Sequence, residues 1–181
     1  MNWPNRLTIA RVALVPVIVA LLQFDSPVCQ TLALAAFIAA ALTDWLDGYL
    51  ARKYQIVTNL GKFLDPVADK LLVLSTMIAL SGLLRFPAWV CVVVLFRELA
   101  VDGLRLVAVE QGRVIAAGKL GKIKTTLQML ALVAVMLGEG TFGGLPVAQA
   151  LTYAAVVMTL WSGVDYFVRN GQVLWQKGGA A

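Results

Sequence analysis

Long apolar stretches alternate with short polar or charged segments along almost the whole chain. Six stretches predict transmembrane helices, and they lie near residues 7–23, 31–50, 63–84, 88–109, 125–138 and 146–168. A helix of roughly 20 residues crosses a hydrocarbon core of about 30 Å, and lipid leaves the backbone of an open sheet without partners. The pattern therefore predicts an all-α polytopic membrane protein, with six transmembrane helices in one bundle and a single domain over residues 1–181.

Composition supports a membrane location. Of the 181 residues, 60% are hydrophobic and only 14% are charged, which is too apolar for a water-soluble domain of this size. A signal peptide is the alternative at the N-terminus, because Arg6 and Arg11 precede apolar residues. No small-residue cleavage site follows, and Pro16 interrupts the segment. We therefore expect the first helix to remain in the protein.

Basic residues predict the orientation, because Lys and Arg are enriched on the cytoplasmic side of inserted helices. One side of a six-helix chain would carry Arg6, Arg11, Arg52, Lys53, Lys62, Arg113, Lys119, Lys122, Lys124, Arg169 and Lys177, and the other only Arg85. Both termini and the loops at 52–62 and 110–124 are therefore expected in the cytoplasm, at the inner membrane. The net charge of +5 favours acidic lipids or phosphate ligands over nucleic acid.

Cysteine and histidine usage narrows the chemistry. Cys29 and Cys91 both fall near the predicted outer face, where a disulfide is possible, but we expect two free thiols because no spacing motif accompanies them. The chain has no histidine. This removes the commonest general base and favours Mg²⁺ or Mn²⁺ with oxygen ligands over zinc.

Four aspartates form the main candidate site. Asp44 and Asp47 are three residues apart and Asp65 and Asp69 are four apart, so each pair lies on one face of its helix. Charged side chains within a membrane helix cost at least about 2.5–3.5 kcal/mol near its centre, and four converging carboxylates repel unless a cation neutralises them. Oxygen ligands of this number suit one or two Mg²⁺, Mn²⁺ or Ca²⁺ ions. Interhelical ion pairs with Arg52, Lys53, Lys62 and Lys70 are the alternative.

The residues after Asp47 indicate what such a metal would serve. Gly48 and Ala51 make a small face on which a bulky ligand can approach the backbone, and Arg52 lies one turn beyond Gly48. Arginine binds phosphate with a fork of donors. A metal next to arginine is the arrangement that phosphoryl chemistry needs, because negative charge must be neutralised on the attacking and leaving groups.

These residues resemble the signature of the CDP-alcohol phosphotransferase family. The match is Asp44-Trp45-Leu46-Asp47-Gly48-Tyr49-Leu50-Ala51-Arg52, eight residues, Gly61, three residues, Asp65, three residues, Asp69. The resemblance implies a six-helix membrane enzyme, usually a homodimer, with a two-metal site on the cytoplasmic side. Such an enzyme transfers a phosphoalcohol from a CDP-linked donor to an acceptor hydroxyl and releases CMP.

Elements outside the signature are similar to those of bacterial family members that use CDP-diacylglycerol as donor and sn-glycerol 3-phosphate as acceptor. They are the opening Pro4-Asn5-Arg6-Leu7-Thr8 with Arg11 and Pro16, then Arg97-Glu98-Leu99, Gly121-Lys122-Ile123-Lys124-Thr125-Thr126 and Ser162-Gly163-Val164-Asp165-Tyr166-Phe167. This likeness extends over nearly the full length. It implies a phosphatidyltransferase of phospholipid biosynthesis.

The resemblance also implies roles for individual residues. Asp44, Asp47 and Asp65 would be the main metal ligands, with Asp69 near the metal and acting as the base that deprotonates the acceptor. CDP-diacylglycerol would contact Asn5, Thr8, Gly48, Arg52 and Thr58. For the acceptor phosphate we expect a basic group of Arg11, Arg105, Lys122 and Lys124.

Simpler explanations exist for several of these residues. Asn5 and Thr8 would serve equally as helix caps. Membrane topology alone explains basic loops without any ligand. Arg97 and Glu98 would equally form a buried structural pair.

Two alternative functions remain open. Within the family, the acceptor could be phosphatidylglycerol, which would make the enzyme a cardiolipin synthase, or serine or an inositol phosphate. From another class, intramembrane carboxylates are typical of a divalent-cation transporter. A transporter places its ligands near the midplane on discontinuous helices and often has repeated halves. The acids here lie near one predicted face and no repeat is visible, which favours the enzyme.

Overall fold

The described part of the chain folds into six α-helices. A computed structural model describes residues 3–54, 59–116, 118–138 and 146–175, with the side chains of 3–6, 44–54 and 59–63 outside the description. The helices are α1 (Trp3–Leu22), α2 (Pro27–Tyr54), α3 (Asn59–Gly82), α4 (Ala88–Glu110), α5 (Lys119–Leu137) and α6 (Pro146–Asn170), followed by the 3₁₀ turn η1 (Gly171–Leu174). These ranges contain no strand, so the all-α prediction is confirmed for them.

The helices extend beyond several of the apolar stretches that predicted them. α2 covers 27–54 where 31–50 was expected, and α5 begins at Lys119 where the apolar stretch begins at 125. Hydropathy identifies the part of a helix that can be buried. The backbone continues its hydrogen bonds into the polar ends, so element boundaries are the least certain part of such a prediction.

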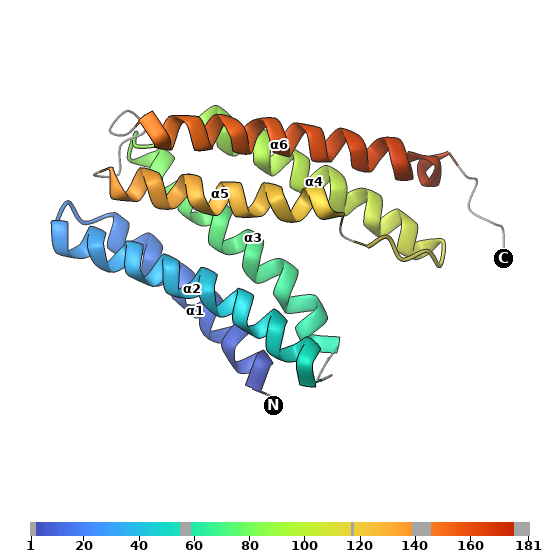
Figure 1. The fold of residues 1–181 in the computed structure, drawn as a ribbon, viewed down its shortest axis with the longest axis horizontal. Helices are drawn as coiled ribbons and strands as arrows, with labels where there is room; N and C mark the ends of the chain where they lie inside the picture. The colour runs from blue at the N-terminus through green and yellow to red at the C-terminus, as the bar shows by residue number, and fades with distance from the viewer. Residues whose placement is uncertain (1–2, 55–58, 117, 139–145, 176–181) are drawn as a thin grey trace.

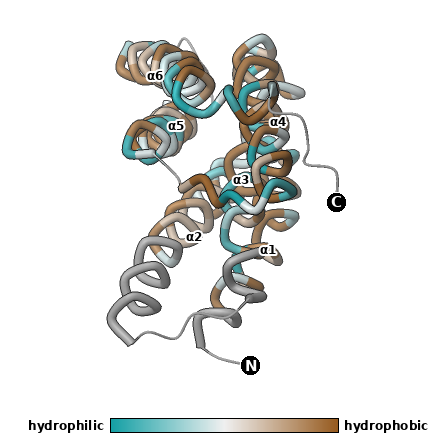
Figure 2. The backbone as a smooth tube through the Cα atoms, turned by 90° about the vertical axis from the view of Figure 1, so that its right-hand side faces the viewer, coloured by the Kyte–Doolittle hydropathy of each residue, from teal (hydrophilic) through white to brown (hydrophobic). Residues whose placement is uncertain are grey.

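The helices run alternately up and down the long axis of the molecule. In Figure 1 the starts of α1, α3 and α5 and the ends of α2, α4 and α6 lie toward the same side, which we call the basic end. Seen from that end, α3 lies between the pair α1 and α2 and the group α4, α5 and α6 (Figure 2). α1 packs against α2 and α3, α5 packs against α6, and α4 packs against α3 and α6. The connections that carry the predicted basic loops are therefore brought together at one end.

One apolar core joins all six helices. Ile18, Phe37, Leu72 and Leu132 are fully buried in it, together with residues of α4 and α6. A smaller cluster of Val101, Leu104, Ala108, Tyr166 and Val173 packs α4, α6 and η1 together near the basic end. A shared core of this kind supports one bundle.

The outer surface is also apolar. Phe96, Trp161 and Val168 are between 65% and 77% exposed, and large exposed apolar side chains of this kind mark contact with a membrane or with another protein when they form a patch. Two helical segments of the described chain, Lys119–Leu137 and Pro146–Leu174, are long and apolar enough by themselves to cross a membrane.

The end opposite the basic end carries few charges. Arg85 Nη2 donates a hydrogen bond of 2.9 Å to Asp25 Oδ1 there. Cys29 and Cys91 are free thiols, as expected from the sequence.

Candidate active site

Two carboxylates of α3 are held by side chains of α1. Thr8 Oγ1 donates a hydrogen bond of 2.9 Å to Asp65 Oδ1, and Arg11 Nη1 lies 3.3 Å from Asp69 Oδ1. Thr8 and Arg11 are three positions apart, and Asp65 and Asp69 are four positions apart. Each spacing is about one helical turn. Because α1 and α3 run in the same direction, successive turns of one helix meet successive turns of the other. The prediction that Asp65 and Asp69 share a helix face is confirmed.

Burial is unequal across these pairs. Thr8 and Arg11 are each 1% exposed, whereas the Asp69 side chain is 32% exposed and Asp65 is exposed. A buried guanidinium is tolerated only when it is paired and hydrogen-bonded. Arg11 therefore holds Asp69 from the protein side, while the carboxylate keeps an approach from outside.

This arrangement changes the interpretation of Thr8 and Arg11. The helix-capping explanation is wrong for Thr8, because α1 begins at Trp3 and the Thr8 hydroxyl bonds to Asp65 on another helix. Arg11 is buried against Asp69, and its predicted role at the acceptor phosphate stays a prediction. The side chain of Asn5 lies outside the described residues.

The other two signature aspartates lie near the end of α2. Its helical backbone includes Asp44, Asp47, Gly48 and Arg52, and α2 packs against α1 and α3. The side chains of these four residues, and all of Thr58, lie outside the described part of the chain. No cluster of three acidic side chains occurs among those that are described, so a four-carboxylate metal site stays a prediction.

A second charged cluster is centred on Glu98 of α4. Its carboxylate pairs with Lys124 of α5, lies 3.1 Å from Arg97 Nη1, and lies 3.8 Å from Lys70 Nζ of α3. Lys70 also pairs with Asp102. Glu98 is 7% exposed and Lys124 is 5% exposed. This cluster ties three helices together, and it confirms that Arg97 and Glu98 form a buried structural pair.

This cluster bears on two predictions. The alternative in which Lys70 neutralises the signature aspartates receives no support, because Lys70 pairs with Glu98 and Asp102. Lys124, expected at the acceptor phosphate, contacts Glu98 in the structure, and its role at the phosphate stays a prediction. The sequence signal for the cluster was the spacing of Glu98 and Asp102, which puts two acids on one face of an otherwise apolar helix.

The other two residues predicted for the acceptor phosphate are more accessible. Arg105 Nε donates a hydrogen bond of 3.0 Å to the Tyr166 hydroxyl, and its guanidinium lies 5.5 Å from the centre of that ring. Lys122 is exposed near the start of α5. Arg11, Arg105 and Lys124 thus have partners on three different helices, so the structure does not gather the four predicted residues around one partner.

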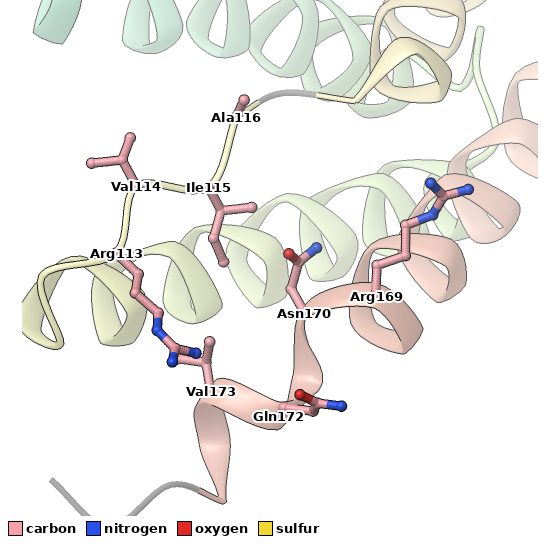
Figure 3. Close-up of a pocket in the computed structure, with 8 residues that line it drawn as sticks. All are labelled: Arg113, Val114, Ile115, Ala116, Arg169, Asn170, Gln172 and Val173. Carbon is pink, nitrogen blue, oxygen red and sulfur yellow. The ribbon is translucent and has the colours of Figure 1, made fainter.

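A hollow of about 380 Å³ opens at the basic end (Figure 3). Its lining residues are Arg113, Val114, Ile115, Ala116, Arg169, Asn170, Gln172 and Val173. They come from the connection after α4 and from the end of α6 with η1. None of the residues predicted for the metal, the donor or the acceptor lines it.

Comparison with known proteins agrees with the signature. Residues 1–161 match the CDP-alcohol phosphatidyltransferase family. The chain is 44% identical to the CDP-diacylglycerol–glycerol-3-phosphate 3-phosphatidyltransferase of Bacillus subtilis, over 96% of this chain and 97% of that protein. It is 39% identical to the protein of the same name from Rickettsia bellii, over 92% of this chain and 93% of that protein. It is also 36% identical to a cardiolipin synthase (CMP-forming) of Oryza sativa, over 96% of this chain and 59% of that protein.

The helical bundle, with Asp65 and Asp69 near one end of α3, agrees with the helical fold that the signature implies. The chain belongs to the CDP-alcohol phosphatidyltransferase family.

Proposed function

We propose that this chain transfers the phosphatidyl group of CDP-diacylglycerol to sn-glycerol 3-phosphate, forming phosphatidylglycerophosphate and releasing CMP. The observation that carries the proposal is the likeness, over almost the full length, to the Bacillus subtilis enzyme whose name states these substrates. The arrangement of Asp65 and Asp69 on α3 supports it, because two anchored carboxylates that open to the outside suit a reaction between phosphates.

In this reaction Asp69 takes the proton from the acceptor hydroxyl. The hydroxyl oxygen then attacks the β-phosphorus in line, and the bond from that phosphorus to CMP breaks. Arg11 holds one oxygen of Asp69, so the carboxylate does not have to reorient when the acceptor arrives. Thr8 holds Asp65 in the same way.

The donor set fits magnesium or manganese. Carboxylate oxygens are the ligands these ions prefer, and Asp65 and Asp69 are accessible from outside the bundle. We propose that Asp44, Asp47, Asp65 and Asp69 hold two such ions. When bound, they supply positive charge that neutralises the diphosphate and the leaving CMP.

Substrate contacts follow from the same residues. We propose that Asn5, Gly48, Arg52 and Thr58 bind the cytidine diphosphate together with Thr8. For the acceptor phosphate we propose Arg105 and Lys122, which are the accessible members of the predicted basic group. Arg11 and Lys124 would act through the carboxylates they contact.

We propose that all six helices span the inner membrane, with both termini in the cytoplasm. The grouping of basic residues at the basic end supports this topology, because Lys and Arg are enriched on the cytoplasmic side of a membrane. The residues at this end include Arg113, Lys119, Lys122 and Arg169. Single cysteines at the exposed positions Val114 and Leu84, in a chain lacking Cys29 and Cys91, test it. A membrane-impermeant thiol reagent added to intact cells should label the cysteine at 84 and spare the one at 114. The reverse labelling would refute this orientation.

A homodimer is proposed from the family resemblance. Cross-linking of the purified chain in lipid nanodiscs should give a species of twice the monomer mass, and a monomer alone would contradict the proposal.

An acceptor panel tests the transferase function. Purified protein with CDP-diacylglycerol and Mg²⁺ or Mn²⁺ receives sn-glycerol 3-phosphate, phosphatidylglycerol, serine or inositol phosphate in turn, and released CMP is measured. Release with sn-glycerol 3-phosphate alone is expected. Release with phosphatidylglycerol would instead favour cardiolipin synthesis, the reaction named for the Oryza sativa relative. Silence with every acceptor would leave the transferase proposal without support.

A divalent-cation transporter is the remote alternative. It predicts Mn²⁺ uptake into proteoliposomes in the absence of CDP-diacylglycerol, and we expect none.

A further inference from the structure

The hollow at the basic end is a second candidate site that the proposed transferase function does not use. Its volume of about 380 Å³ lies within the range of about 300–1,000 Å³ typical of small-ligand pockets. It is bounded by the connection after α4 on one side and by the end of α6 with η1 on the other (Figure 3). Asp65 and Asp69 are not among its lining residues.

Its charge favours an anion. Arg113 and Arg169 both line the hollow, and its lining contains no acidic side chain. Within the described part of the chain, Arg113 has no side-chain hydrogen bond or ion pair. Arg169 uses Nε to contact Asp165 Oδ1 at 2.7 Å, which leaves its two terminal nitrogens for another acceptor. Figure 3 shows the Arg169 side chain pointing away from Arg113, so Arg113 is the guanidinium group at the hollow that suits the oxygens of a phosphate.

The walls of the hollow are fixed by hydrogen bonds. Gln111 Nε2 donates to the carbonyl oxygen of Val173 at 2.9 Å, which ties the end of α4 to η1. Asn170 Nδ2 donates to the carbonyl oxygen of Tyr166 at 2.9 Å and so keeps its own carbonyl oxygen available to a hydroxyl donor. A preformed site loses less conformational entropy when a ligand binds.

The surroundings indicate a lipid rather than a soluble anion. Val114, in the lining, is 90% exposed, and Trp175, directly after η1, is 88% exposed. Apolar and tryptophan side chains next to arginines are typical of the membrane–water interface. The basic end is also where an anionic leaflet would lie in the proposed topology.

We propose that this hollow binds the headgroup of an anionic phospholipid. The lipid phosphate pairs with Arg113, a headgroup hydroxyl donates to Asn170, and the acyl chains lie over Val114 and Trp175. The site is separate from the transfer site and does not depend on the proposed reaction.

A binding titration tests the proposal. The full-length protein, purified in a nonionic detergent, is titrated with short-chain dihexanoyl phosphatidylglycerol, and dissociation constants are measured by thermophoresis. Dihexanoyl phosphatidylcholine, sn-glycerol 3-phosphate and inorganic phosphate are the comparison ligands. The test variant is Arg113→Gln. The matched control is Lys119→Gln, which removes one exposed charge at the same end without touching the hollow.

Loss of one charge-assisted hydrogen-bond donor should weaken phosphatidylglycerol binding about tenfold in Arg113→Gln. Lys119→Gln should change it by less than about twofold. Equal weakening in both variants would mean only a diffuse basic surface, and would overturn the proposal. So would equal affinity for phosphatidylcholine, or inorganic phosphate that binds as tightly as the lipid. A chain that is silent in the acceptor panel can still pass this test, so the two proposals fail separately.

Discussion

Arg11 of α1 and Asp69 of α3 are 58 positions apart in the sequence and lie 3.3 Å apart in the fold. The guanidinium is buried, and the carboxylate is one-third exposed. The first helix therefore orients the residue that we propose as the base. All fixed residues of the signature lie in α2 and α3, yet Asp65 and Asp69 are contacted by side chains of α1.

Replacing Arg11 tests this dependence. Arg11→Gln should lower the rate of CMP release at least about tenfold and the free energy of unfolding by about 2 kcal/mol, because Asp69 loses its charged partner. Arg11→Lys keeps the positive charge but loses the planar guanidinium group. Its rate of CMP release and its stability should lie between those of the unchanged protein and those of Arg11→Gln. Release rates and thermal unfolding measured on the same preparations provide the check. Normal activity of Arg11→Gln would rule out the positioning role.

Removing the Thr8 hydroxyl tests a single hydrogen bond and should have a smaller effect than replacing Arg11. Thr8→Val keeps the side-chain shape and removes the donor to Asp65, so stability should fall by about 1 kcal/mol. The Mg²⁺ concentration needed for half-maximal activity should rise because Asp65 is less well oriented. Thr8→Ser retains the hydroxyl and serves as the control. If Thr8→Ser and Thr8→Val behave alike, the hydrogen bond is not the cause.

Asp69 should be indispensable for transfer. Asp69→Asn removes the proposed base while keeping the size of the side chain, and CMP release should fall by roughly 10²–10⁴-fold. Asp25→Asn, at the opposite end of the bundle, is the control and should leave the rate unchanged. An Asp69→Asn protein with full activity would exclude Asp69 as the base.

Glu98 should matter mainly for stability. It faces Lys70, Arg97 and Lys124, so Glu98→Gln leaves buried cations without their shared partner and should destabilise the fold by about 3–5 kcal/mol. Adding Lys124→Met to Glu98→Gln removes one of those cations and should restore part of the loss. Thermal unfolding in detergent measures both variants. A double variant less stable than Glu98→Gln would show that the cations do not depend on Glu98.

Gly163 makes room for Arg97. A Cβ added at Gly163 would lie 3.2 Å from Arg97 Cγ, whereas one added at Gly103 would meet nothing within 4 Å. Gly163→Ala should therefore unfold at a lower temperature than Gly103→Ala, because Arg97, whose Nη2 donates to Ser162 Oγ at 3.2 Å, must move by a few tenths of an ångström. Gly103→Ala should be neutral or stabilising, since alanine favours the helix. The unfolding temperatures of the two variants test this prediction. A higher unfolding temperature for Gly163→Ala than for Gly103→Ala would contradict it.

The sequence by itself determined the number of helices, the shared face of Asp65 and Asp69, and the family. Each follows from local information: a helix needs a continuous apolar stretch, a face needs a spacing of three or four residues, and a signature needs fixed residues at fixed intervals. The free cysteines were likewise predicted correctly.

The tertiary structure decided which charges meet. The sequence placed Arg11, Arg105, Lys122 and Lys124 in one basic group, because all four belong to the predicted cytoplasmic side. The fold showed, in addition, that Arg11 pairs with Asp69 and Lys124 with Glu98. Arg11 and Asp69 are 58 positions apart, and Glu98 and Lys124 are 26 apart. Whether such distant residues meet depends on how the helices pack and on the rotation of each helix about its axis, which the hydropathy pattern does not specify. The carboxylates of α3 were therefore visible in the sequence, whereas the side chains that hold them became visible only in the fold.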